Sequence, residues 1–285
     1  ITWSKFDELL GWMATATSKY DVICVQELLR SVDDMYRVAS QATGMRLHSV
    51  MGPSLHTIAG GLSAGVCILS EWHKDIKEVS LPVDFKLDNT IVKLAFWPGN
   101  LARDIVIGSV YLHDSITVDG ALNFILLQQI EAALIASNVP FVLSGDWNCD
   151  PAPLSATGFT TRTRSTVAHV GDATYVSGGS ATELDFFVVS DVLASAISAV
   201  KMHEGSPLAK HRPVQLTFQA ERLRLPAQGL CRPSMYPTDT YLSCANCPAP
   251  RQLEPDVLAP QGADFEHFYK QWASLAEQEL DAHFV

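Results

Sequence analysis

The chain has 285 residues, of which 47% are hydrophobic and 18% are charged, so it can bury a full core and is neither disordered nor fibrous. No stretch approaches the roughly 18 consecutive apolar residues of a membrane span. The formal net charge is −11, and the chain lacks the basic runs that are usual where a protein holds nucleic acid by its phosphates. Two alternatives stay open: a small substrate, or a divalent metal ion that supplies positive charge at the site.

Apolar runs and helical spacing predict a series of elements along the first 220 residues. An amphipathic helix over 2–13 is followed by a buried strand over 21–28 that ends in Gln26-Glu27, and by a helix over 31–43. Further strands are predicted over these ranges: 46–50, 65–70, 75–81, 90–97 and 104–112. The longest helix is predicted over 119–136, and three strands follow, over 141–146, 183–190 and 212–219. Adjacent strands with helices inserted between them favour a layered α+β sandwich over a doubly wound parallel sheet.

The character of the chain changes after Ala220. Residues 221–262 are rich in proline and read as a linker, and 263–285 predict a C-terminal amphipathic helix docked on the domain or on a further C-terminal neighbour. Cys244 and Cys247 have the spacing of one zinc-ligand pair without a second pair, whereas a disulfide framework is not expected at this length. The chain opens at Ile1 rather than at a methionine, which leaves open that it is a fragment.

Five polar residues lie at or just beyond the ends of apolar strands. They are Glu27, Asp146, Asn148, Asp185 and His211. Each alone has a plain structural explanation, such as an Asx-turn for Asp146 and Asn148. Carboxylate and amide oxygens are the hard ligands that Mg²⁺ and Mn²⁺ prefer, and a histidine beside a carboxylate is suited to handle a proton or contact a phosphate. Taken together, the five predict metal-assisted hydrolysis of a phosphoester.

The order of the motifs supplies a resemblance. "DVICVQEL", "IGSVYLHD", "LSGDWNCDP", "ELDFFVVS" and "KHRPVQL" follow one another as in the endonuclease/exonuclease/phosphatase superfamily, which has the deoxyribonuclease I-like fold. Details such as "GGLSAGVCILS" and "GDWNCDP" look most like the endonuclease domains of non-LTR retrotransposons and their apurinic-endonuclease-like relatives. The resemblance covers residues 1–220 and implies a four-layered α/β/β/α sandwich of two mainly antiparallel sheets, with the site at one mouth of the sandwich.

The resemblance also implies roles for single residues. Glu27 would bind the metal ion, Mg²⁺ or Mn²⁺. Asp146 would orient and deprotonate the attacking water, and Asn148 would fix the water or a phosphate oxygen. Tyr111 would contact the scissile phosphate. His211 would pair with Asp185 and stabilise the pentavalent transition state.

Two departures from the family pattern bear on activity. The Asn that the family carries on its first strand has no counterpart in Ile1-Thr2-Trp3-Ser4, so that strand lies upstream or has Ser4 in place of Asn. Lys210 precedes His211 where the family usually has Asp, and a cation there would repel a divalent ion.

Three functions therefore compete at the level of the sequence. The first is an endonuclease that nicks DNA, the second a phosphatase or phosphodiesterase acting on a small or lipid phosphate, and the third a decayed domain kept as an interaction module. The resemblance implies DNA as the substrate, a reverse-transcriptase-like C-terminal neighbour in a longer protein, no membrane partner and an intracellular setting, with the nucleus as a candidate.

Overall fold

The computed structural model describes residues 7–8, 11–12, 15, 20–57, 60–71, 74, 76–79, 87–98, 104–203 and 210–219. They all belong to the first of two compact units of the chain, Ile1–Ala227. The predicted linker over 221–262 and the predicted C-terminal helix over 263–285 lie outside the described residues. So does most of the predicted helix over 2–13, whose described positions are helical.

A six-stranded sheet forms the centre of the unit, in the order β10-β13-β9-β8-β7-β6. Its strands are β10 (Ser165–Ala168), β13 (Asp185–Ser190), β9 (Phe141–Asp146), β8 (Ile105–Tyr111), β7 (Val92–Trp97) and β6 (Lys77–Glu78). All neighbours are antiparallel except β8 and β9, which are parallel. Helix α3 (Ala121–Ser137) makes the crossover that this parallel pair requires.

A second layer of strands packs on one face of this sheet. It contains a three-stranded antiparallel sheet in the order β1-β5-β2 and a separate pair, β14-β15. Their bounds are β1 (Val22–Val25), β5 (Val66–Glu71), β2 (Leu47–Gly52), β14 (Ile197–Met202) and β15 (Val214–Phe218). Two short hairpins project from the layers: β3 (Leu55–His56) with β4 (Leu62–Ser63), and β11 (Tyr175–Ser177) with β12 (Ser180–Thr182).

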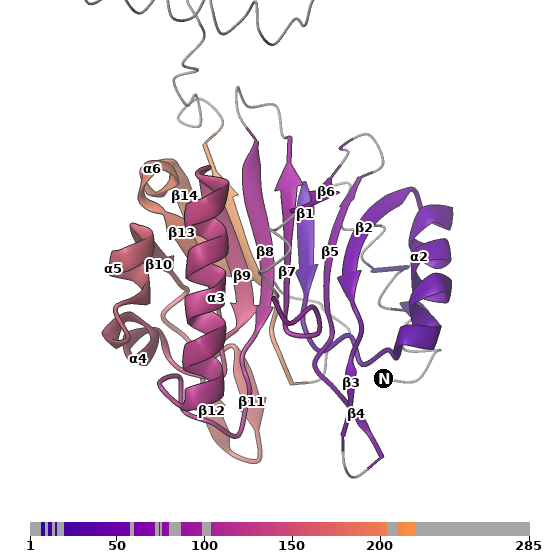
Figure 1. Cartoon of the computed structure of the whole chain (residues 1–285), viewed down its shortest axis with the longest axis horizontal. Helices are drawn as coiled ribbons and strands as arrows, with labels where there is room; N and C mark the ends of the chain where they lie inside the picture. Colours follow the sequence, from indigo (N-terminus) through magenta and orange to yellow (C-terminus); the bar gives the residue numbers. More distant parts are fainter. Residues whose placement is uncertain are drawn as a thin grey trace, which may run out of the picture. The chain divides into compact units, whose positions relative to one another are not determined.

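Alternation of side chains along β5 shows how the layers are held together. Cys67 and Leu69 face α2 (Met35–Gly44) and share one core with it, whereas Ile68 between them belongs to the core that joins the two sheets. On the far side, α3 buries Leu127 and Ile130 against the six-stranded sheet. Figure 1 shows α3 in front of the six-stranded sheet, running along its strands, and α2 beside β2. The three cores confirm the predicted order of layers, α/β/β/α.

Several short elements were not predicted from the sequence. They are β3, β4, β10, β11, β12 and β14, together with α4 (Pro151–Ala156), α5 (Phe159–Thr163) and α6 (Asp191–Ala194), whereas the helix predicted over 31–43 is formed as the 3-10 helix η1 (Val32–Asp34) followed by α2. Most are two to six residues long and partly exposed, so they lack the long apolar runs from which the other strands were predicted. Conversely, the strand predicted over 75–81 is formed in the described residues only at Lys77–Glu78, an exposed edge strand. Among the described helices, none has both the length and the apolar character to cross a membrane.

Candidate active site at the strand ends

Three of the predicted site residues lie side by side in one row of the six-stranded sheet. Asp146, the last residue of β9, is paired with Tyr111 at the end of β8 and with Asp185 at the start of β13. Asp146 follows Val142 by four residues and Asp185 precedes Phe187 by two, and both of those apolar residues lie in the core between the sheets. Both carboxylates therefore face the second layer, at the mouth of the sandwich.

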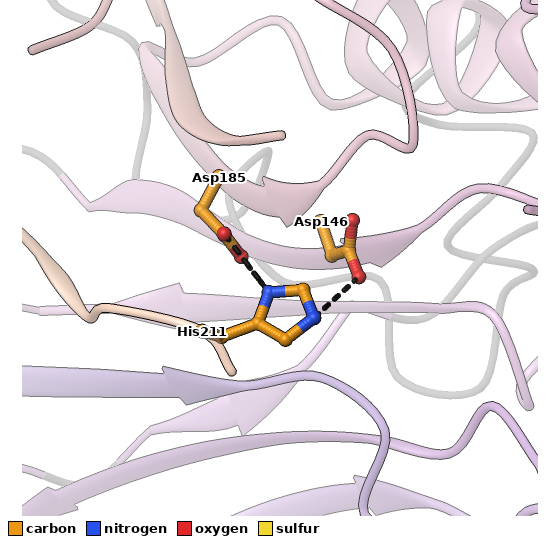
Figure 2. Close-up of side chains that lie close together, drawn as sticks. All are labelled: Asp146, Asp185 and His211. Atoms are coloured by element: carbon orange, nitrogen blue, oxygen red, sulfur yellow. Dashed lines mark hydrogen bonds and ion pairs between the residues drawn. The ribbon is translucent and has the colours of Figure 1, made fainter. Parts of the chain in front are cut away.

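His211 joins the two carboxylates of this row. Its Nδ1 lies 3.0 Å from Oδ2 of Asp185, and its Nε2 lies 3.9 Å from Oδ2 of Asp146 (Figure 2). Because an ionised carboxylate only accepts hydrogen bonds, Nδ1 is the donor to Asp185. The imidazole also packs against Tyr175, with ring centroids 4.8 Å apart. The sequence did not predict Tyr175 as a site residue, because a single aromatic residue in a short polar strand is not part of a recognisable motif.

Trp147 fixes the loop between Asp146 and Asn148. Its side chain is fully buried, is stacked on Phe186 at 5.5 Å, and donates a hydrogen bond from Nε1 to the carbonyl of Phe186 at 3.0 Å. Gly145 makes room for it, because a Cβ there would lie 3.0 Å from two atoms of the indole and 3.0 Å from the carbonyl oxygen of Val110. The buried indole is therefore the anchor that sets where the polar residues on either side of it lie.

Asn148 adopts a left-handed backbone conformation, with φ at 48°, which asparagine tolerates better than most residues. Its backbone N–H donates to Oδ1 of Asp146 at 3.2 Å, and its side-chain amide donates to the carbonyl of Leu112 at 2.6 Å. The amide nitrogen is thus committed to the backbone, and the acceptor Oδ1 is the atom with which Asn148 can act on water.

Glu27 reaches the site from the second layer of strands. It follows β1 with φ at 53°, a conformation that is uncommon for glutamate and is found at functional sites. Its Oε1 accepts a hydrogen bond from the hydroxyl of Tyr111 at 3.1 Å. Tyr111 is itself buried, and burial, followed by the negative charges of Glu27, Asp114 and Asp146, raises its pKa, so that its hydroxyl stays protonated and donates.

Gln26 was not predicted as a site residue, although it stands directly before Glu27. Its side-chain amide crosses between the layers and donates to Oγ of Ser109 at 3.0 Å and to the carbonyl of Ser144 at 3.3 Å. Ser109 in turn donates to the carbonyl of Val25 at 3.1 Å. The polar pair Gln26-Glu27 at the end of the first predicted strand could have indicated this role, because an amide at that place can form hydrogen bonds between the two layers of strands.

The electrostatics of the site are dominated by crowded negative charge. Burial, followed by the charges of Asp185 and Glu27, raises the pKa of Asp146 to about 7, although His211 and the N–H of Asn148 act in the opposite direction. Burial by itself would lower the pKa of His211, but the hydrogen bond to Asp185 and the surrounding carboxylates outweigh it and raise the pKa. The arrangement places a carboxyl group with a raised pKa beside a histidine whose pKa is also raised.

The donor set fits a divalent cation. Ligand atoms of Asp146, Asp185 and His211 all lie within 4.8 Å of one another, and negative charge there is only partly offset: burial, followed by the charges of Asp185 and Glu27, raises the pKa of the Asp146 carboxyl. A hard cation with carboxylate ligands would supply that missing charge. Lys210 has an exposed side chain, while its carbonyl accepts a hydrogen bond from the N–H of Val176 at 3.1 Å.

Comparison with known proteins gives one family and a set of similar folds. The model of the Endonuclease/Exonuclease/phosphatase family matches residues 5–208. Among curated proteins, no sequence matches this chain.

Solved structures resemble the chain in fold. A variant of the 3' phosphatase NExo from Neisseria, bound to a product DNA hairpin, has 15% identity and a TM-score of 0.55, covering 74% of this chain and 94% of its own. The endonuclease domain of the telomere-specific non-LTR retrotransposon TRAS1 has 14% identity and a TM-score of 0.54, covering 75% and 92%. The AP endonuclease LMAP from Leishmania major has 18% identity and a TM-score of 0.56, covering 75% and 82%. At these identities the likeness supports the fold alone.

The predicted motifs thus come together at one mouth of a four-layered sandwich, and the family match spans well over half of the 285 residues. The chain belongs to the Endonuclease/Exonuclease/phosphatase family.

Proposed function

We propose that the chain is a divalent-metal-dependent phosphodiesterase that nicks DNA. The observation that carries the proposal is the pair of carboxylates of Asp146 and Asp185 with the imidazole of His211 between them, at the mouth of the sandwich. Support for DNA as the substrate comes from the similar structures, which include a retrotransposon endonuclease, an AP endonuclease and a phosphatase bound to a DNA hairpin.

In this mechanism Asp146 accepts the proton of the attacking water. Burial, followed by the charges of Asp185 and Glu27, raises the pKa of Asp146 in the metal-free chain, so this carboxylate is a stronger base than an exposed aspartate. Asn148, whose N–H holds Oδ1 of Asp146, orients the same water through its own Oδ1.

His211 stabilises the charge that develops on the phosphate. Asp185 holds the imidazole by Nδ1, which leaves Nε2 as the donor to a non-bridging oxygen in the transition state. Tyr111 holds Glu27 in place through its hydroxyl and lies at the same end of the sheet, where it would also border the scissile phosphate.

Glu27 would bind Mg²⁺ or Mn²⁺ together with a carboxylate of the row that includes Asp146. The bound ion would neutralise negative charge on the phosphate and stabilise the leaving oxygen. The composition left open whether the substrate is small or a metal ion supplies positive charge at the site. In the proposed mechanism a metal ion, rather than a basic face, supplies that charge to a chain of net charge −11.

The test is the nicking of supercoiled plasmid by the full chain, with Mg²⁺, with Mn²⁺ and with excess EDTA. We expect nicked circles with either metal, none with EDTA and none from Asp146→Asn. Asp104→Asn is the matched control, because Asp104 is exposed at the opposite end of β8. Nicking that persists in EDTA, or that Asp146→Asn leaves unchanged, would contradict the proposal.

A second candidate function is hydrolysis of a small or lipid phosphate, which the net charge of −11 favours because an acidic surface repels DNA. Turnover of a soluble phosphodiester or monoester without plasmid nicking would select it. The decayed domain is the third candidate, based on Lys210 and on the stretch Ile1-Thr2-Trp3-Ser4, which contains no counterpart of the Asn on the family's first strand. Absence of both activities from a folded chain that still binds a partner would select that one.

The surroundings of the domain are also part of the proposal. We expect the domain to span residues 1–220, followed by the linker over 221–262 and the helix over 263–285. We also expect it to lie within a longer intracellular protein with a reverse-transcriptase-like neighbour, with the nucleus as a candidate location.

A further inference from the structure

Thr174 is fully buried and lies directly before the β11–β12 hairpin, but its side chain forms hydrogen bonds with the start of β13. Its hydroxyl oxygen accepts two hydrogen bonds, from the N–H of Leu184 at 3.0 Å and from the N–H of Asp185 at 2.9 Å. These two residues form the entry to β13. The hydroxyl of Thr174 therefore holds the backbone from which the Asp185 carboxylate projects.

The backbone of the same residue holds the segment that carries His211. The carbonyl of Thr174 accepts a hydrogen bond from the N–H of Arg212 at 2.7 Å, and the N–H of Thr174 donates to the carbonyl of Thr182 at 3.0 Å. The next residue, Tyr175, forms an antiparallel bridge with His211 and packs its ring on the imidazole. Thr174 is thus bonded to both sides of the Asp185–His211 pair, which are 26 residues apart in the chain.

The hydroxyl oxygen is the part of Thr174 that this arrangement requires. Valine has the same shape but no acceptor. In Thr174→Val the backbone N–H groups of Leu184 and Asp185 would lose their hydrogen-bond acceptor, and the backbone would have to rotate for them to reach another acceptor. Such a rotation would move the start of β13, where Asp185 pairs with Asp146. Serine keeps the acceptor and lacks only the methyl group.

We propose that Thr174 is a positioning residue for the Asp185–His211 pair, fixing the distance between carboxylate and imidazole through its hydroxyl and its carbonyl. The inference rests on the proposed hydrolase function for its effect on turnover, but the geometry it describes can be measured without activity.

The test compares Thr174→Val with Thr174→Ser in the full chain. Ser190→Ala is the control for a simple loss of stability. The hydroxyl of Ser190 accepts a hydrogen bond from the N–H of Phe141 at 3.1 Å, and Ser190 lies at the end of β13 opposite to Asp185. We expect Thr174→Val to lower kcat by about 10- to 100-fold, the range found when groups that orient functional side chains are removed, with KM changed less than about 3-fold. Thr174→Ser should restore kcat to within about 3-fold of the parent, and Ser190→Ala should leave kcat unchanged.

The second measurement is nuclear magnetic resonance of the His211 imidazole, which reports the Nδ1–H bond to Asp185 whether or not the chain is active. The downfield Nδ1 proton should be present in the parent and in Thr174→Ser and lost or shifted in Thr174→Val. If the parent hydrolyses nothing, the proposed function fails, while this signal still supports or overturns the positioning role. An unchanged signal in Thr174→Val, or an equal loss of kcat in Ser190→Ala, would overturn the inference.

Discussion

Asp146 and Asp185 stand directly opposite each other on the antiparallel strands β9 and β13, and the ring of His211 lies between their carboxylates. Two ionised carboxylates directly opposite each other repel, unless a positive charge compensates them. The pairing therefore lowers the stability of the folded chain, which indicates that it serves a function. The pairing lies at the mouth of the sandwich, in the middle of the candidate active site.

The first prediction concerns the stability of the chain without metal. In the unfolded chain an aspartate loses its proton near pH 3.9, whereas burial and neighbouring charges keep the proton on Asp146 up to about pH 7 in the folded chain. The folded state binds more protons between these values, so the free energy of unfolding falls as the pH rises through this window. Asp146→Asn removes the titrating carboxyl and keeps an oxygen for the N–H of Asn148.

We therefore expect Asp146→Asn and the parent to be similarly stable near pH 4, and the variant to be more stable by about 2–4 kcal/mol at pH 8. Urea denaturation at both pH values in EDTA measures this difference. A variant that is equally or less stable than the parent at pH 8 would show that the carboxylate is well compensated in the folded chain.

The second prediction concerns turnover. His211→Ala should lower kcat by at least about 10²-fold, because it removes the group that faces the developing charge. Asp185→Asn should have an effect in the same direction, since an amide cannot hold the imidazole as a carboxylate does. Circular dichroism should show both variants folded. A loss of activity that accompanies loss of the folded state would instead indicate a structural role.

The third prediction concerns the metal ion. Mg²⁺ or Mn²⁺ should raise the melting temperature of the parent at neutral pH, because an ion that binds only the folded state stabilises it. Glu27→Ala should abolish both this rise and plasmid nicking. Glu27→Gln keeps an acceptor for the hydroxyl of Tyr111 and removes only the charge, so it should also lose the rise in melting temperature. A metal-dependent rise that survives in Glu27→Gln would remove this residue from the ligand set.

The fourth prediction concerns Lys210, which the sequence pattern marks as a cation next to the site. Its side chain is exposed, and the long stem can carry the ammonium group into solvent, where its charge is screened. Lys210→Asp should therefore change the half-saturating Mg²⁺ concentration for nicking by less than about 3-fold. Titrations of the parent, Lys210→Asp and Lys210→Ala measure this effect. A tightening of tenfold or more in Lys210→Asp would mean that the cation does oppose the metal ion.

Much of the fold followed from local patterns. The apolar run that begins at Phe141 predicts β9 with the bounds that the structure has, and the motifs in their order indicated the layered sandwich. The edge strand over 165–168 and the hairpin around Tyr175 could not be predicted, because short, partly polar strands are defined by their partners rather than by their own periodicity.

The sequence by itself determined which polar residues stand at strand ends, since side-chain alternation and apolar runs are local properties of the chain. Only the tertiary structure decided that Asp185 lies opposite Asp146, that His211 comes between them and that Lys210 points to solvent. Register between strands 39 residues apart depends on contacts that no local pattern encodes. The raised pKa of Asp146 has the same origin, because desolvation and neighbouring charge arise only when distant segments pack together.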